Sequence, residues 1–180
     1  MLDYPLVNPG PPRSSRILTP QGFSRHHGQE RHVVPGGGAL LVQLMVGDRL
    51  TLINDEGGQP GELVAAAKDG RIDAAILGQA ANSSAEGLKA MLASGEDSLA
   101  RLRKGLVARK IDLAKAGALR LFGPETPAGT RAELTALDDG WLVVAAPGLP
   151  MAPEAQDTAT PLTLLVQRAR PRMVGHFDLP

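Results

Sequence analysis

The sequence predicts a mainly β fold of the α+β class, either a β-sandwich or a partly open barrel, with a helical insertion near residues 83–116. Short apolar runs alternate with turn signals such as Asp69-Gly70 and Gly123-Pro124, as strands joined by tight turns would require. Only one stretch of the sequence has apolar residues at the i, i+3, i+7 spacing of an amphipathic helix. No strand–helix–strand rhythm recurs, which argues against a doubly wound fold.

The amino-acid composition excludes several classes of function and chemistry. The 180 residues fit one domain, and their net charge of +0 with 3% aromatic residues disfavours a nucleic-acid partner. No apolar run has the length of a membrane span and no signal-like start is present, so a cytoplasmic location is predicted. The absence of cysteine excludes disulfides, thiolate metal ligands and cysteine nucleophiles.

Three regions follow from the distribution of proline. Residues 1–35 are predicted to be an extended Pro-rich arm, residues 36–169 a single β-rich domain, and residues 170–180 a tail or linker. The arm contains His26, His27, Glu30 and His32, which are residue types that bind metals. Because no helix holds them together, we interpret them as a solvated loop and predict no metal site.

The domain begins with four predicted strands in a meander, near residues 39–46, 49–54, 60–66 and 71–77. Further strands are predicted at 118–122, 130–137, 141–145 and 161–168. Trp141, the single tryptophan, leads an apolar run and is interpreted as a core anchor.

The helical part is predicted to hold two helices. Ser83 and Glu86 have the spacing of a capping box at the start of the first. The second begins near Ser98, and its buried face is expected to carry Leu99, Leu102, Leu106 and Val107. Its basic residues are interpreted as a solvated outer face, since the chain as a whole is neutral.

Two segments resemble the urea carboxylase-associated (urea amidolyase-associated) family. The first runs from Gly47 to Leu63 and contains the Gly57 and Gln59 of the family's signature turn, with Asn54 and Glu62 where the family has aspartates. The second runs from Gly129 to Met151 and continues at residues 161–166, like the family's closing strands. The family's cysteine-containing loop is replaced here by residues 145–150, which hold no thiol and no carboxylate.

This resemblance implies a degenerate copy of the domain that serves a structural or interaction role. It predicts no catalytic residue, no metal and no cofactor within these residues, and a ligand-binding set of Asn54, Asp55, Gln59 and Glu62. The alternative is a small-molecule amidohydrolase or deiminase for a urea- or guanidine-like substrate, with Glu62 as acid/base and Asn54 and Gln59 orienting the substrate. A third interpretation is a ligand-sensing β-domain without enzymatic activity.

Copies of this kind also resemble the amino-terminal part of proteins related to the aminomethyltransferase of glycine cleavage. The resemblance implies a role in one-carbon or amine metabolism, with an adjacent transferase-like domain or subunit as the partner. Folate would then bind in that partner domain. No membrane partner is expected, and a homo-oligomer is possible.

Overall fold

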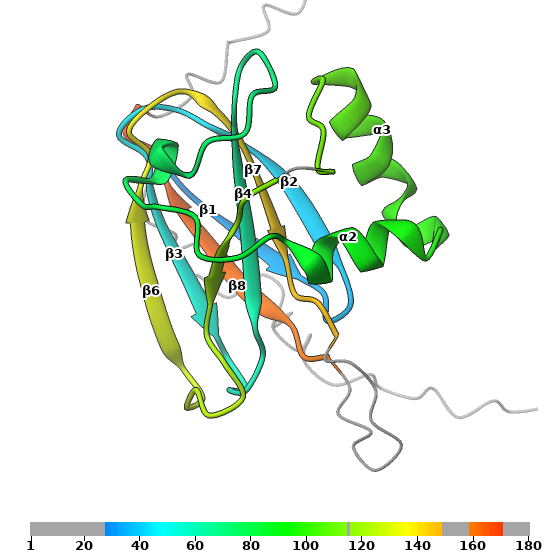
Figure 1. Ribbon diagram of the computed structural model, residues 1–180. Coiled ribbons are helices and arrows are strands. Elements are labelled where there is room, and N and C mark those ends of the chain that lie inside the picture. Colours follow the sequence, from blue (N-terminus) through cyan, green and yellow to red (C-terminus); the bar gives the residue numbers. More distant parts are fainter. Residues whose placement is uncertain (1–27, 115, 149–158, 171–180) are drawn as a thin grey trace, which may run out of the picture.

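The computed structural model describes residues 28–114, 116–148 and 159–170, and within them two antiparallel sheets pack face to face (Figure 1). The predicted β-sandwich is therefore confirmed. The rest of the predicted arm, residues 1–27, and the tail from residue 171 lie outside the described residues.

Each sheet has four strands within the described residues. Sheet A has the order β1 (Gln29–Val34), β8 (Leu162–Gln167), β3 (Arg49–Asn54) and β6 (Thr130–Thr135). Sheet B has the order β2 (Ala39–Leu44), β7 (Gly140–Ala145), β4 (Gly61–Ala67) and β5 (Leu119–Leu121).

The core of the sandwich forms because side chains alternate between the two faces of each strand. In β8, Leu162, Leu164 and Val166 are fully buried between the sheets, and Leu142 and Val144 of β7 meet them from sheet B. β7 pairs with both β2 and β4, so it is an interior strand. The predicted buried strand at 141–145 is confirmed.

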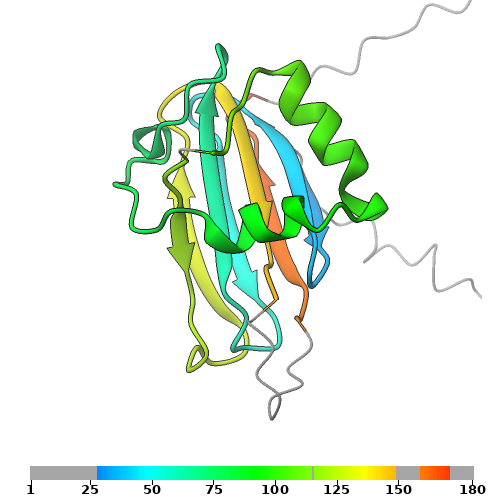
Figure 2. The same ribbon diagram turned by 45° about the vertical axis from the view of Figure 1, so that its right-hand side comes forward.

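A helical layer covers the outer face of sheet B (Figure 2). It contains α2 (Glu86–Ala93), the 3₁₀ turn η3 (Asp97–Leu99) and α3 (Ala100–Ala108). Leu88, Leu102 and Leu106 pack there on Val64 and Val143 in a second apolar core. The 3₁₀ turn η2 (Ala74–Leu77) lies apart from this layer, at the β6 side of the sandwich, and buries Ile76 and Leu77 in the core between the sheets. None of the described helices is long and apolar enough to cross a membrane.

Trp141 belongs to this second core. Its side chain is half-buried on the helix-facing side of β7, and the Arg109 guanidinium lies 3.9 Å from the ring centroid. The ring therefore anchors the end of α3 by packing and by a cation–π contact. The sequence prediction of a core anchor holds, although the core in question lies outside the sandwich.

Several predicted elements were wrong. The first strands do not form a meander: β2 and β3 are consecutive in the chain but lie in opposite sheets. Residues 71–77 form an isolated bridge at Ile72 and then η2, because Asp73 caps a 3₁₀ turn by accepting a hydrogen bond from the Ala75 N–H. Residues 29–34, placed in the arm, form β1, whose partner β8 lies more than 120 residues away.

The predicted helices exist, but with two errors. Leu99, Leu102 and Leu106 are buried as expected, whereas Val107 is 79% exposed. The predicted capping box does not form. Ser83 Oγ accepts from the Ala85 N–H, Glu86 accepts from the Ser84 hydroxyl, and the N-cap residue is Ala85, whose side chain makes no cap.

Candidate functional site

Asn54 ends β3 and organises the turn that follows it. Its amide group is fully buried, with Nδ2 donating to the Gln59 carbonyl at 2.9 Å and Oδ1 accepting from the Gly57 N–H at 3.0 Å. Gly57 has φ +83°, and a Cβ there would lie 2.7 Å from the Ala128 nitrogen. Glycine is therefore required at this position, and an amide at 54 supplies both the donor and the acceptor that the turn needs.

An aspartate at position 54 is expected to destabilise the fold. Asn54→Asp replaces the donor by an oxygen that faces the Gln59 carbonyl inside the protein, so we expect a loss of about 2–3 kcal/mol in unfolding free energy. Denaturant unfolding followed by Trp141 fluorescence measures this. Asn82→Asp is the matched control: Asn82 likewise donates to a carbonyl, that of Arg120, but it is exposed, and its loss should stay below about 1 kcal/mol. Equal losses would contradict the role given to Asn54.

Gln59 joins three loops at the same end of the sandwich. It is 4% exposed, and its Nε2 donates to the carbonyls of Pro60 and Pro147 at 2.9 and 2.7 Å. Its Oε1 accepts from the Thr160 N–H at 2.8 Å. One side chain thus ties the β3–β4 turn to the exit of β7 and the entry of β8.

Glu62 lies on β4 and points toward the helical layer. The side chain is 2% exposed, with Oε2 accepting from the Leu88 N–H at 2.8 Å and Oε1 from the Gly87 N–H at 3.2 Å. These are unpaired donors of the first turn of α2, where the helix dipole also favours a negative charge. Glu62 therefore supplies from the sheet the cap that Ala85 lacks. Because glutamates are usually exposed, the sequence favours a solvated strand-edge carboxylate at this position, and that prediction is wrong: Glu62 is buried on a strand that pairs on both sides.

Asp55 lies apart from the other three residues of the predicted set. It is exposed, and its Oδ2 accepts from the Thr163 hydroxyl at 2.7 Å on the outer face of sheet A. Arg31 Nη2 donates to the same hydroxyl oxygen at 3.3 Å. Asp55 therefore belongs to a surface cluster.

The predicted set is thus only partly brought together. Asn54 and Gln59 share the β3–β4 turn, and Gln59 and Gly87 both contact Pro147, which places the helix cap next to that turn. The buried polar atoms described above point at backbone groups of the same chain. That arrangement can fix loops and a helix, and it gives an acid/base role for Glu62 no geometric support.

Sequence reasoning missed a buried ionic cluster centred on Arg168. Its guanidinium donates to Glu30 through Nε at 2.9 Å and Nη2 at 2.7 Å, and through Nη1 to Asp48 Oδ2 at 2.6 Å and the Gln43 carbonyl at 2.8 Å. The Arg168 side chain is 4% exposed and Asp48 is fully buried. The cluster joins β1 and β8 of sheet A to β2 of sheet B. The four positions are spread over 139 residues of chain, so no local motif signals them.

Charges within the cluster shift two pKa values. Hydrogen bonds from Arg168 lower the pKa of Glu30 below its ordinary value of 4.5, against the opposing effect of burial. The hydrogen bond from Glu30 in turn raises the pKa of Arg168. The His32 imidazole, 3.3 Å from Glu30, adds a smaller lowering effect on the same carboxylate.

This shift predicts an acid-dependent loss of stability. A group whose pKa is lower in the folded state stabilises it above the ordinary value, and that contribution disappears as the pH falls from about 4.5 through the folded-state pKa. We expect about 1 kcal/mol, discounted because the Glu30 side chain is 35% exposed. Unfolding free energies of the wild type and Glu30→Gln, measured from pH 6 downward, should therefore converge in acid. A constant difference would contradict the assignment. Asp73 and Asp139 also have lowered pKa values, so their ion pairs add to the loss of stability in acid. This contribution is the same in the wild type and the variant, and it cancels in the difference between their unfolding free energies.

The histidine-rich motif of the arm is only partly visible. His26 and His27 lie outside the described residues, whereas Glu30 and His32 lie on β1, with Glu30 engaged by Arg168. In the part of the chain that the structure describes, no group of three His, Cys, Asp or Glu side chains could hold a metal ion.

Comparison with known proteins adds one relative. No family model matches the chain, so the likeness to the urea carboxylase-associated family stays a prediction. The chain is 48% identical over 182 residues to the trimethylamine-oxide aldolase of Ruegeria pomeroyi, and the match covers 100% of this chain but 23% of that enzyme. The chain thus spans less than a quarter of the relative's length. It is similar to one part of a larger enzyme.

Proposed function

We propose that this chain forms a non-catalytic structural and interaction domain of a larger enzyme of the trimethylamine-oxide aldolase kind, and that it is related to the urea carboxylase-associated family. The observation that carries the proposal is that Asn54, Gln59 and Glu62 make structural hydrogen bonds within the domain. The hydrogen bonds described for these three buried side chains hold backbone groups of the domain itself, at distances of 2.7 to 3.2 Å. The high identity to one part of a larger enzyme supports the same assignment.

The reacting groups then belong to other parts of that enzyme. An adjacent aminomethyltransferase-like domain or subunit is the proposed partner, and the relative's additional length leaves room for one. Folate, if the enzyme uses it, would bind in that partner domain. Such an arrangement would place the chain in amine and one-carbon metabolism.

The proposal is tested by measuring activity and ligand binding of the purified chain alone, and activity of a variant of the full-length relative. The purified chain should not consume trimethylamine oxide and should show no thermal shift with tetrahydrofolate, because a ligand that binds the native state raises its stability. In the full-length relative, changing the residue that aligns with the exposed Asp55 to asparagine should leave kcat unchanged. Turnover by the chain alone, or a large fall in kcat with the fold intact, would overturn the proposal.

A further inference from the structure

β6 forms a margin of sheet A and leaves one edge unpaired (Figure 1). On the same side of the sandwich, the edge strand of sheet B, β5, already has hydrogen-bond partners along its outer edge. Asn82 accepts from the Arg120 N–H at 2.7 Å and donates to the Arg120 carbonyl at 3.2 Å, as a neighbouring strand would. An unpaired strand edge is a ready template for another strand.

Two hydrogen bonds show which residues of β6 face that open edge. Ala136 continues the β3–β6 ladder by donating to the Asp48 carbonyl, whereas Leu137 turns the other way and donates to the Ile76 carbonyl of η2. Backbone groups alternate in direction along an antiparallel strand. The odd-numbered residues Arg131 and Glu133 therefore direct their N–H and C=O groups outward, and in the described part of the chain no hydrogen bond reaches those N–H groups.

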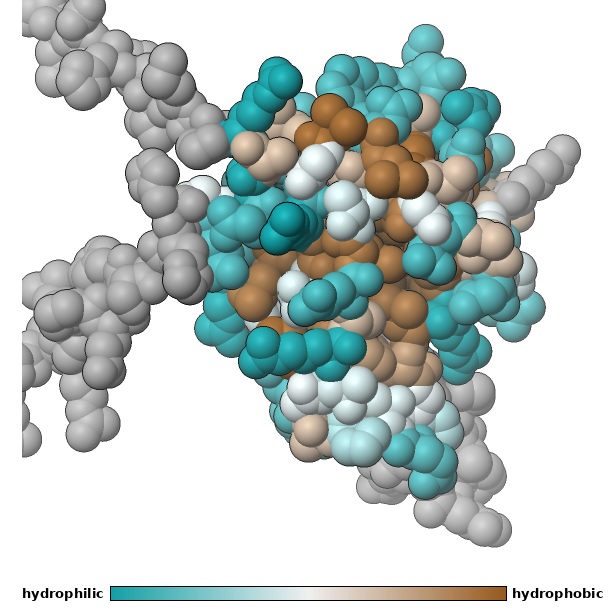
Figure 3. Space-filling model, turned by 90° about the vertical axis from the view of Figure 1, so that its left-hand side faces the viewer, coloured by the Kyte–Doolittle hydropathy of each residue, from teal (hydrophilic) through white to brown (hydrophobic). Residues whose placement is uncertain are grey.

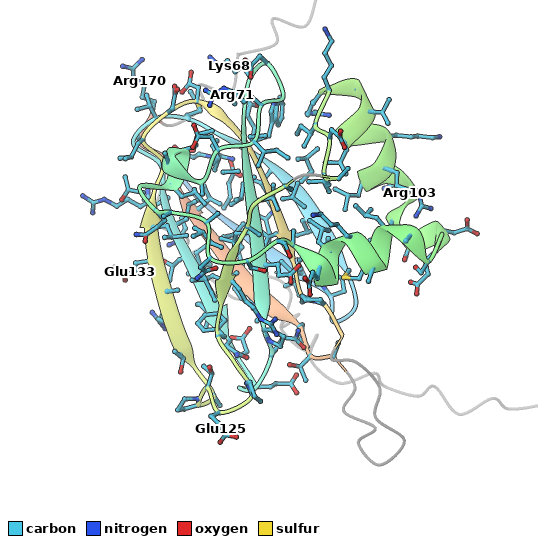
Figure 4. The ribbon with its side chains drawn as sticks, in the orientation of Figure 1. Lys68, Arg71, Arg103, Glu125, Glu133 and Arg170 are labelled. Atoms are coloured by element: carbon cyan, nitrogen blue, oxygen red, sulfur yellow. The ribbon has the colours of Figure 1, made fainter. Side chains whose placement is uncertain are left out.

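The side chains of these two residues make β6 complementary to itself. Arg131 and Glu133 are both exposed on the outer face of sheet A, two residues apart, and Glu133 projects away from the strand (Figure 4). If a second β6 pairs antiparallel with its centre at Ala132, each Arg131 lies directly opposite Glu133 of the second copy. The two copies then form two such Arg131–Glu133 pairs. Each is a hydrogen-bonded pair of the antiparallel ladder, as it must be because the backbone N–H and C=O groups of these residues point outward.

Neighbouring registers are disfavoured. A shift of the centre by one residue in either direction sets Arg131 against Arg131 or Glu133 against Glu133, and directly opposed like charges destabilise a sheet. In the favoured register, Leu134 meets Thr130 of the second copy on the inner face. Leu134 is half-buried and lines an open groove with Leu77 and Leu137. Figure 3 shows this side of the molecule, where apolar surface lies between hydrophilic side chains.

We propose that two copies of this chain associate through β6, so that sheet A continues across a two-fold axis at Ala132. The other open strands are poorer candidates within the described residues. β2 carries no charged side chain, and the outer face of β1 carries Arg31 without an acidic residue.

Sedimentation and light scattering of the full chain test the proposal. We expect a species of twice the monomer mass of 18.8 kDa at micromolar concentration. Glu133→Arg or Arg131→Glu alone should weaken the dimer by about tenfold or more, and the double exchange should restore it. Glu125→Arg, a reversal at an exposed loop residue, should leave the dimer unchanged. A monomeric wild type, or a dimer indifferent to the single reversals, would overturn the proposal.

A crosslink tests the register independently of charge. The chain has no cysteine, so Ala132→Cys introduces one thiol per copy at the proposed axis. The two Cα atoms would lie about 4.5 Å apart in a non-hydrogen-bonded pair, within the range that a disulfide spans. Ala132→Cys should oxidise to a covalent dimer, while Thr135→Cys, more exposed but far from its mate in this register, should not. Equal crosslinking at both positions would refute the register.

Discussion

Arg168→Met is expected to lower the free energy of unfolding by about 3–5 kcal/mol, the largest effect of any single substitution considered for this protein. Methionine retains most of the apolar stem but removes the guanidinium that meets Asp48 at 2.6 Å. Asp48 is fully buried, and of its hydrogen bonds among the described residues it would keep those from the N–H groups of Met45 and Ala169. An uncompensated carboxylate in the interior is costly because burial disfavours its charged form.

Arg170→Met provides the control for this prediction. Arg170 lies two residues further along the chain, is exposed and projects into solvent (Figure 4), so its replacement should change the unfolding free energy by less than about 0.5 kcal/mol. Arg168→Lys should fall between the two, because an ammonium keeps the charge but cannot make four directed contacts. Denaturant unfolding measures all three variants. A loss below about 1 kcal/mol for Arg168→Met would show that the cluster is dispensable.

The strands could be predicted from sequence because alternation is a local property. Leu50 and Leu52 alternate with polar residues, and glycine-containing turns bound the run, so β3 was found with its correct bounds. The assignment of strands to sheets could not be predicted in this way. β3 pairs with β6 and β8, and those contacts involve residues at least 76 positions away in the chain, a separation that no turn signal encodes. β1 was missed for the same reason.

The candidate site was predictable only as a list of polar residues. Gly57 and Gly58 mark the turn after Asn54, and the resemblance to the urea carboxylase-associated family selects the four polar residues of the predicted set. The function of its side chains depends on partners such as Pro147 and Thr160, which the sequence does not place nearby. The same holds for Glu62: a charged residue in an apolar strand gives a local signal, but its partner α2 is identified only once β4 and the helical layer are packed together.

Glu62→Leu should therefore act on α2 before it acts on the sandwich. The substitution leaves the N–H groups of Gly87 and Leu88 without an acceptor in a buried position, and we expect a loss of about 2–4 kcal/mol. Amide hydrogen exchange should show the loss of protection concentrated in residues 86–93, with the interior strand β7 least affected. Glu62→Gln, which keeps one acceptor oxygen, should lose about half as much.

Glu86→Leu separates capping from charge at the same helix. Glu86 is the first residue of α2 and is exposed, so its removal costs the favourable interaction with the helix dipole and one surface hydrogen bond from the Ser84 hydroxyl, together less than about 1 kcal/mol. If Glu62→Leu and Glu86→Leu had equal effects, the buried carboxylate would not be the cap. If Glu62→Gln instead abolished turnover in a full-length enzyme whose α2 kept its exchange protection, the same carboxylate would have a chemical role. Exchange and turnover measured on one variant thus distinguish a helix cap from an acid/base group.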